Sequence, residues 1–140
     1  MSIGKLGNTD ALAILRAGTL GRLGCIAADW PYVVPVNYYF DGENIYIHTL
    51  PGKKLDALRA NPRVCLQVDE IKDSFNWRSV IVYGTFEEVS REETRENVLT
   101  RLYSRLPHLT PVESKLVKGL KETIVFRIKV DQVTGVSEEW

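Results

Sequence analysis

The chain has 140 residues, about the length of one ordinary domain, and its 18 Lys and Arg residues balance its 18 Asp and Glu residues. This balance excludes the strong basic surface that attracts nucleic acid or anionic lipid. No apolar stretch is long enough to cross a bilayer, and the two cysteines, Cys25 and Cys65, lie in separate apolar runs. We therefore expect a single domain over residues 1–140 that is cytoplasmic and binds neither nucleic acid nor a membrane.

The chain opens with the pattern of a short helix. Thr9 or Asp10 is a suitable cap for its first turn, and the apolar spacing extends to Ala17. Gly18 follows at the position where a left-handed residue commonly ends a helix. We therefore expect a helix from about Thr9 to Ala17 that ends at a left-handed Gly18.

Alternating apolar and polar residues predict six strands. They cover residues 22–28, 32–40, 45–49, 64–68, 79–89 and 123–130. Asp41-Gly42 is a strong hairpin turn, residues 29–31 form another turn, and residues 71–77 form a polar loop with two aromatic residues. Strands that are mostly consecutive and joined by hairpins favour antiparallel pairing and closure into a small, mainly β barrel.

Three further helices are expected beside these strands. A short one begins at Lys53 and stops at Asn61-Pro62, because the residue before a proline is pushed out of the helical region. The capping box Ser90-Arg91-Glu92-Glu93 begins a longer helix that Pro107 ends. A second capping box, with proline at the first helical position, predicts a short helix over residues 110–119.

Pro35 interrupts the predicted strand over residues 32–40. A proline cannot donate a hydrogen bond to a β-ladder, so this strand is expected to have a free edge or a bulge there. Backbone groups left free beside Pro35 could bind a ligand, and a plain edge-strand proline explains the residue equally well.

The stretch from Asn44 to Glu70 combines several groups that bind anions. The predicted strand in it ends at Thr49, Pro51-Gly52 breaks the chain, and a helix begins at Lys53 and Lys54. One loop thus holds a hydroxyl, two ammonium groups and the free N–H groups of a helix N-terminus, which is the chemistry of a phosphate site. The alternative is a solvated connector with two surface lysines.

The sequence gives little support for metal or hydrolytic chemistry. His48 and His108 are far apart and lack neighbouring carboxylates or thiolates, so no ordinary metal set is expected. Serine-nucleophile, Walker and dinucleotide glycine motifs are absent. An enzyme of this kind would take its chemistry from a bound organic cofactor. His48, one residue before Thr49, could line a ligand pocket or simply pack on the barrel surface.

Four segments occur in a specific order. They are P-V-N-Y after a strand, D-G-E-N-I-Y-I-H-T, G-K-K-L-D-A-L-R-A-N-P-R-V-C-L-Q-V-D-E and W-R-S-V-I-V-Y-G-T-F-E-E-V. Together they resemble the pyridoxamine 5'-phosphate oxidase-like family of FMN-binding split barrels, and its branch of nitroimidazole-resistance-type flavoproteins, over roughly residues 12–135. The resemblance implies a six-stranded antiparallel split β-barrel with flanking helices, and a homodimer with two FMN sites between its subunits.

The resemblance also implies roles for single residues. Lys53 and Lys54 match the basic pair that holds the FMN phosphate, and Thr49 matches a hydroxyl on that phosphate. This match favours the phosphate site over the solvated connector. His48 lies beside this group and is a candidate donor on the substrate side, the one candidate for a catalytic role.

Two other segments match the surroundings of the flavin ring. The backbone of one strand would run along the ring, which makes ring neighbours of Pro35, Val36, Asn37 and Tyr38. Ser79 and Val80 match the start of the strand that meets the polar edge of the ring. Trp77 would cover the ring, from its own subunit or from the partner.

The match departs from the oxidase itself in two places. Val33 and Tyr38 stand where the oxidase carries an arginine and a lysine, and the chain ends at Trp140 without the arginine- and tryptophan-rich segment that contacts pyridoxal phosphate. We therefore expect a substrate other than vitamin B6. Related split barrels bind haem or the deazaflavin F420, which stay alternatives to FMN.

Two functions follow from this resemblance. The first is an FMN-dependent oxidoreductase that passes hydride or electrons between reduced flavin and a small organic substrate. The second is a non-catalytic module that carries or senses flavin, haem or F420. Steady-state turnover of a nitroaromatic compound or a quinone with NAD(P)H separates the two.

Overall fold

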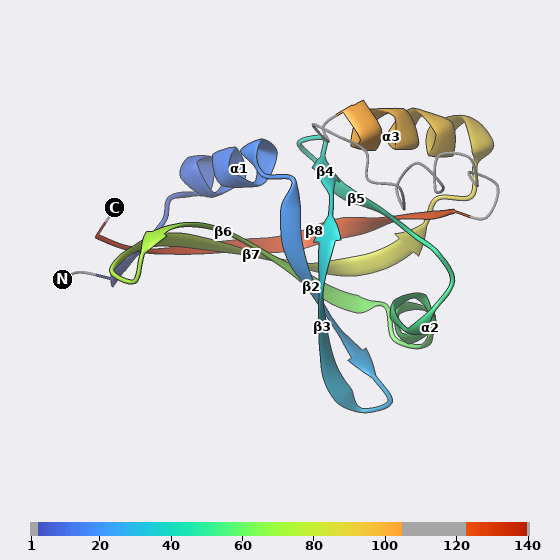
Figure 1. Ribbon diagram of the computed structural model, residues 1–140, viewed down its shortest axis with the longest axis horizontal. Helices are drawn as coiled ribbons and strands as arrows, with labels where there is room; N and C mark the ends of the chain where they lie inside the picture. The colour runs from blue at the N-terminus through green and yellow to red at the C-terminus, as the bar shows by residue number, and fades with distance from the viewer. Residues whose placement is uncertain (1–2, 105–122, 140) are drawn as a thin grey trace.

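The structure is a computed structural model and describes residues 3–104 and 123–139. Within these residues it contains eight strands and three helices (Figure 1). In chain order they are β1 (Ile3–Lys5), α1 (Asn8–Ala17), β2 (Leu20–Ala27), β3 (Trp30–Asn37), β4 (Tyr39–Phe40), β5 (Asn44–Thr49), α2 (Lys53–Ala60), β6 (Arg63–Asp73), β7 (Asn76–Glu88), α3 (Glu92–Ser104) and β8 (Ile124–Glu138).

The eight strands form one antiparallel sheet. Their order is β3-β2-β6-β7-β8-β5-β4, and β1 pairs with the end of β8. The pairing of β2 with β6 and of β5 with β8 brings together strands that are distant in the chain. The expected mainly β, antiparallel fold with flanking helices is confirmed, but the residues that the structure describes form eight strands and not six.

Tyr38 joins the two ends of this sheet. It is the single residue between β3 and β4, the first and last strands of the order, which do not pair with each other. Its backbone N–H donates to the Thr19 carbonyl at 3.0 Å, and its buried hydroxyl donates to the Leu15 carbonyl at 2.7 Å. The sheet therefore curls into a barrel that is held at Tyr38 and split elsewhere between β3 and β4.

The described part of the chain contains two apolar cores. The main core lies inside the curled sheet, is covered by α1 and α2, and includes Leu15, Leu23, Ile47, Leu58, Leu66, Val80 and Phe126. A smaller core lies between α3 and the other face of β5 and β8, and includes Tyr46, Val98, Leu99, Leu102 and Val125. Alternate side chains of β5 therefore enter two different cores.

The ends of α1 differ from the expectation. Its N-cap is Gly7, without a side-chain cap, and not Thr9 or Asp10. Gly18 does end the helix, but its φ of −75° is not left-handed, so that prediction is wrong. Glycine is needed there for space, because a Cβ atom at Gly18 would lie 2.4 Å from the Tyr38 hydroxyl.

Two connections expected as loops are hairpins between longer strands. The turn expected at residues 29–31 lies at Ala28 and Asp29, whose φ values are 50° and 67°, and residue 30 already belongs to β3. Residues 71–77 belong mostly to β6 and β7, which pair as far as Asp73 and Asn76. The polar composition of that segment suggested a loop, but pairing between the two strands outweighs local preference.

The last strand is also longer than its sequence pattern predicted. β8 continues past residue 130 to Glu138, and it pairs with β5 first and with β1 at its end. Its pairing with β7 shifts in register between Tyr83 and Gly84, where Asp131 is the additional residue. The unpaired Asp131 is thus a β-bulge in β8 opposite Gly84.

Three further expectations concern the strand edge at Pro35, the helix after Ser90 and membrane-spanning segments. The edge predicted at Pro35 is confirmed, since within residues 3–104 and 123–139 β3 pairs only with β2. The helix expected from Ser90 begins at Glu92, while its end at Pro107 and the helix over residues 110–119 lie outside the described residues. Within the described ranges, no helix is long and apolar enough to span a membrane.

Candidate functional site

The N-terminal end of α2 brings Thr49 and Lys54 together. β5 ends at Thr49 and points this side chain inward, and after a short turn the first residues of α2 place Lys54 beside it. The Lys54 ammonium Nζ donates to the Thr49 hydroxyl Oγ1 at 3.2 Å, and that hydroxyl donates to the Leu50 carbonyl at 2.9 Å. The threonine and lysine of the predicted phosphate loop are therefore direct neighbours.

Burial shifts the pKa values of Lys54 and of the nearby Cys25. Lys54 is half-buried, and desolvation lowers the pKa of its ammonium below the ordinary value for lysine. Burial likewise raises the pKa of the Cys25 thiol, which lies near enough for the two groups to influence each other. None of the ion pairs recorded among the described residues includes Lys54. A partly desolvated cation of this kind gains from an anionic ligand.

Lys53 lies on the exposed side of the same turn. Its Nζ atom stands 5.0 Å from the centroid of the Tyr32 ring on β3, a cation–π distance. A Cβ atom added at Gly52, just before α2, would meet no heavy atom within 4 Å, so a ligand has room at the helix start. Two ammonium groups, one hydroxyl and helix N–H groups at an open turn fit the phosphate of a cofactor.

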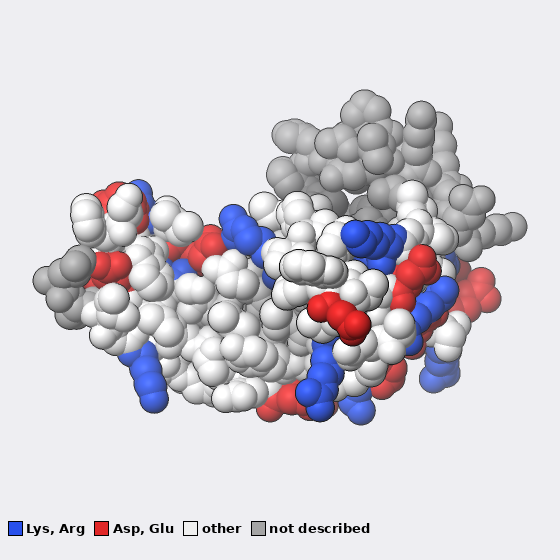
Figure 2. Space-filling view, turned by 90° about the horizontal axis from the view of Figure 1, so that it is seen from below, with Lys and Arg blue, Asp and Glu red and all other residues white. Residues whose placement is uncertain are grey.

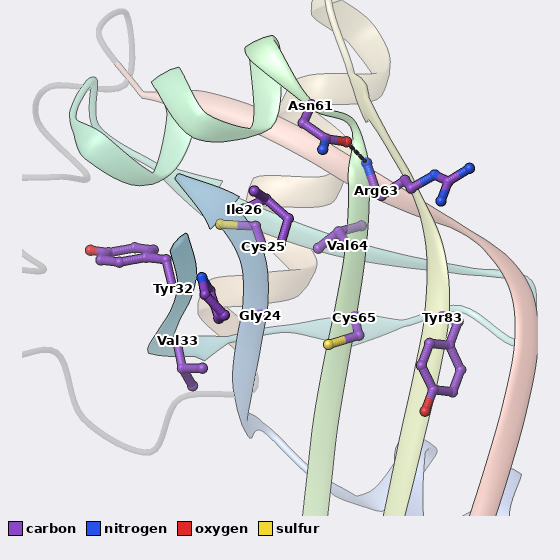
Figure 3. A pocket seen from close by; sticks show the side chains of 11 residues that line it. Gly24, Cys25, Ile26, Tyr32, Val33, Asn61, Arg63, Val64, Cys65 and Tyr83 are labelled. Carbon is purple, nitrogen blue, oxygen red and sulfur yellow. Dashed lines mark hydrogen bonds between the residues drawn. The ribbon is translucent and has the colours of Figure 1, made fainter. Parts of the chain in front are cut away.

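A groove of about 500 Å³ lies next to this turn (Figure 3). Its lining comes from β2, β3, β6 and β7 and from the chain after α2, and includes Tyr32, Val33, Cys65, Tyr83 and Arg63. At Gly24 a Cβ atom would lie 2.8 Å from the Cys65 sulfur, so the glycine leaves space for that thiol. Although Cys65 lies in an apolar run of the sequence, it is half-buried and faces the groove.

A polar cluster crosses the outer face of β2, β6 and β7. The Arg22 guanidinium Nη1 donates to Asp69 Oδ2 at 2.8 Å and to Gln67 Oε1 at 3.2 Å. Gln67 Nε2 donates to Asp69 Oδ2 and to Ser79 Oγ, both at 3.0 Å. Sequence reasoning selected Ser79 alone, because the other three residues join it only through the pairing of three strands.

Several residues expected around the flavin ring have buried side chains. Val36, Tyr38 and Val80 belong to the main core, and the Tyr38 hydroxyl is bonded inside it, so these residues can offer a ligand only their backbone. Pro35 is exposed and Asn37 is half-exposed on the edge strand β3. The edge strand therefore presents these two side chains and its backbone to a ligand.

His48 lies apart from the Thr49 and Lys54 pair. Side chains alternate along β5, so Thr49 points into the barrel while His48 points toward α3. The His48 ring stands 5.4 Å from the ring of Tyr103 on α3, measured between centroids. The structure thus favours the alternative in which this histidine packs on the barrel surface.

Trp77 lies far from α2 within one chain. Its indole Nε1 donates to the buried carboxylate of Glu138 at 2.7 Å, near the tip of the β6–β7 hairpin. That tip and α2 lie toward opposite ends of the long axis of the molecule (Figure 1). One chain therefore divides the predicted cofactor residues into a group around Lys54 and a second group around Ser79 and Trp77.

A profile of the pyridoxamine 5'-phosphate oxidase family matches residues 8–137, nearly the whole chain. The chain belongs to this family. The family expected from the four sequence segments is thereby confirmed. An uncharacterised protein of Rhizobium meliloti (strain 1021) is 30% identical over 144 residues, which cover 96% of this chain and 95% of the relative.

Solved structures of similar proteins agree with this family membership. A FAD-binding protein from Mesorhizobium loti is 32% identical, with a TM-score of 0.81 and coverage of 99% of this chain and 100% of that one. A proposed 5-nitroimidazole antibiotic resistance protein from Bacteroides thetaiotaomicron is 19% identical, with a TM-score of 0.75 and coverage of 98% and 89%. The second likeness shows that the two proteins share the fold of the pyridoxamine 5'-phosphate oxidase family.

Proposed function

We propose that this member of the pyridoxamine 5'-phosphate oxidase family is an FMN-dependent oxidoreductase acting on a small organic substrate. The observation that carries the proposal is the half-buried Lys54 ammonium bonded to Thr49 at the open start of α2. A bound flavin supplies hydride and single-electron chemistry that no amino-acid side chain provides. The protein then has to hold the cofactor, orient its ring and shield it from water.

The phosphate would be held by Lys53, Lys54 and the first N–H groups of α2, and by Thr49 if its hydroxyl turns from the Leu50 carbonyl toward the phosphate. Lys54 is already positioned by Thr49 and partly desolvated, so it loses little freedom when it pairs with a phosphate oxygen. Lys53 is exposed beside Tyr32 and adds a second cation at the rim. Support also comes from the similar Mesorhizobium loti protein, which binds a flavin nucleotide, FAD.

The flavin ring would be held between two copies of the chain. The tip of the β6–β7 hairpin, next to Trp77, lies toward the opposite end of the long axis from α2, and a two-fold axis can set one copy's hairpin against the other copy's α2 (Figure 1). The outer face of the sheet also carries exposed apolar side chains, namely Leu20, Ile26, Val33, Tyr83 and Val136. In the view of Figure 2, uncharged surface covers much of the middle of the molecule. A surface of this kind suits a dimer interface.

An absorption spectrum of the purified protein tests the proposal. We expect a yellow protein that releases FMN on denaturation, identified by mass, and that oxidises NAD(P)H in the presence of a nitroaromatic compound or a quinone. Released FAD would show that the cofactor is FAD and not FMN. A haem Soret band or released F420 would overturn the flavin assignment. A protein that binds FMN tightly but never turns over would support the non-catalytic module instead.

A further inference from the structure

The polar cluster of Arg22, Asp69, Gln67 and Ser79 lies on the outer face of the sheet, in the half of the proposed site that faces the flavin ring. We propose that Gln67, fixed by Arg22 and Asp69, is a positioning residue that commits the Ser79 hydroxyl to donate its hydrogen bond to an acceptor atom of the flavin ring. This inference rests on the proposed function and adds the direction of the hydrogen bond and the residues that set it.

The chemistry of the cluster leaves one arrangement for the Gln67 amide. Arg22 can only donate hydrogen bonds and the ionised Asp69 can only accept them. The amide must therefore turn its oxygen toward Arg22, at 3.2 Å, and its nitrogen toward Asp69, at 3.0 Å. The charged neighbours on either side therefore fix the orientation of the amide.

The same arrangement decides the role of Ser79. One of the two Gln67 Nε2 hydrogens goes to Asp69, and the other goes to Ser79 Oγ at 3.0 Å. The serine oxygen therefore accepts within the cluster, and its own proton is left to donate. Among the hydrogen bonds of the described residues, none uses that proton, and Ser79 is half-exposed on the outer face. The chain thus presents a pre-set hydroxyl donor to a ligand on this face.

A donor at this position has a specific effect on a bound flavin. Reduction increases the negative charge on the ring, and a fixed donor stabilises such charge because it needs no reorientation. Ser79 should therefore bind the reduced cofactor more tightly than the oxidised one, which raises the reduction potential. A serine free to rotate could also accept from the ring N–H, and would favour neither form as strongly.

The reduction potential of bound FMN, together with the dissociation constants of oxidised and reduced FMN, tests the inference. The variants are Ser79→Ala, which removes the donor, Ser79→Thr, which keeps it, and Gln67→Met, which removes the positioning amide at similar size. Arg22→Met provides a second route to the same effect, because it removes the group that holds the amide oxygen and leaves Asp69 alone to orient the amide. Thr85→Ala, an exposed hydroxyl further along β7, is the matched control.

We expect Ser79→Ala to weaken reduced FMN about tenfold more than oxidised FMN, which corresponds to a potential lower by about 30 mV for a two-electron couple. Gln67→Met and Arg22→Met should also lower the potential. In these variants reduced FMN should weaken about threefold more than oxidised FMN. Ser79→Thr and Thr85→Ala should keep the potential of the unmodified protein.

Three results would overturn the inference. If Ser79→Ala still binds FMN and changes its reduction potential no more than Thr85→Ala does, Ser79 does not contact the ring. A shift in Ser79→Ala without any shift in Gln67→Met or Arg22→Met leaves Ser79 as a ring contact and shows that the cluster does not position it. An unmodified protein that binds no flavin overturns the proposed function together with this inference.

Discussion

Lys54 is the residue whose environment says most about the ligand. It is held by Thr49, half-buried, and its pKa is lowered by desolvation. Without a ligand, the folded protein therefore disfavours the charged form relative to the unfolded chain, where the pKa is ordinary. This penalty is present at neutral pH and disappears as the pH rises from the lowered pKa to the ordinary value. The free energy of unfolding of the ligand-free protein should therefore increase with pH over that interval.

Replacing Lys54 by methionine should separate binding from folding. FMN binding should weaken by about 1.5–3 kcal/mol, because one charge-assisted contact to phosphate is lost. Riboflavin, which lacks the phosphate, should lose little, and ligand-free protein should be no less stable at pH 7. Fluorescence titration with both ligands and urea unfolding measure these effects, with the exposed Lys5→Ala as the control.

The pH dependence of binding gives an independent check on Lys54. FMN affinity should fall as the pH rises through the lowered pKa of Lys54, at a lower pH than an exposed lysine would produce. The Lys54→Met variant should lose this part of the profile. Equal weakening of FMN and riboflavin in that variant would place the phosphate elsewhere.

At the scale of the elements, the long strand β8 and its bulge shape the barrel. β8 pairs with β7 over most of its length, and the additional residue Asp131 lets it bend between its contacts with β5 and β1. Gly84 on β7 faces this bend, and a Cβ atom there would lie 2.3 Å from the Lys129 carbonyl oxygen. The two strands can approach this closely only because Gly84 has no side chain.

Gly84→Ala should therefore destabilise the protein by about 1–3 kcal/mol, the usual cost of overpacking a site that cannot relax. Chemical unfolding monitored by circular dichroism measures the loss. Gly4→Ala on β1 is the control, because a Cβ atom there meets nothing within 4 Å. If both variants unfold at the same denaturant concentration, the backbone at the bulge is free to move.

The sequence predicted the elements whose pattern is local, and it missed those that depend on distant partners. The alternation around Ile47 and Leu66 and the helix that begins at Lys53 were predicted close to their observed positions. The β6–β7 hairpin and the extension of β8 were not, because their polar residues become strands only through pairing. Gln67 also escaped notice, since it is brought to Arg22 by the pairing of β2 with β6.

The proposed site takes residues from two copies of the chain, which makes assembly and cofactor binding interdependent. A flavin held by Lys54 of one copy and Ser79 of the other binds only the dimer, so FMN should stabilise the dimer and raise its thermal midpoint. Analytical ultracentrifugation at decreasing protein concentration, with and without FMN, measures this coupling.

The expected result is a dimer that dissociates at lower concentration when FMN is present than when it is absent. Riboflavin serves as the comparison for the contribution of the phosphate. A monomer that retains one FMN per chain would show that a single copy completes the site, and the dimer would have to be abandoned.

The position of β8 in the sheet also affects how the chain folds while it is synthesised on the ribosome. Among the described strands, β5 pairs only with β4 and β8, and β8, the last of them to be translated, supplies Phe126 and Ile128 to the main core. A nascent chain therefore carries an open β5 edge and an unfilled core until β8 has left the exit tunnel. The barrel therefore closes late, so chaperones that shield apolar segments have most of the translation time in which to act.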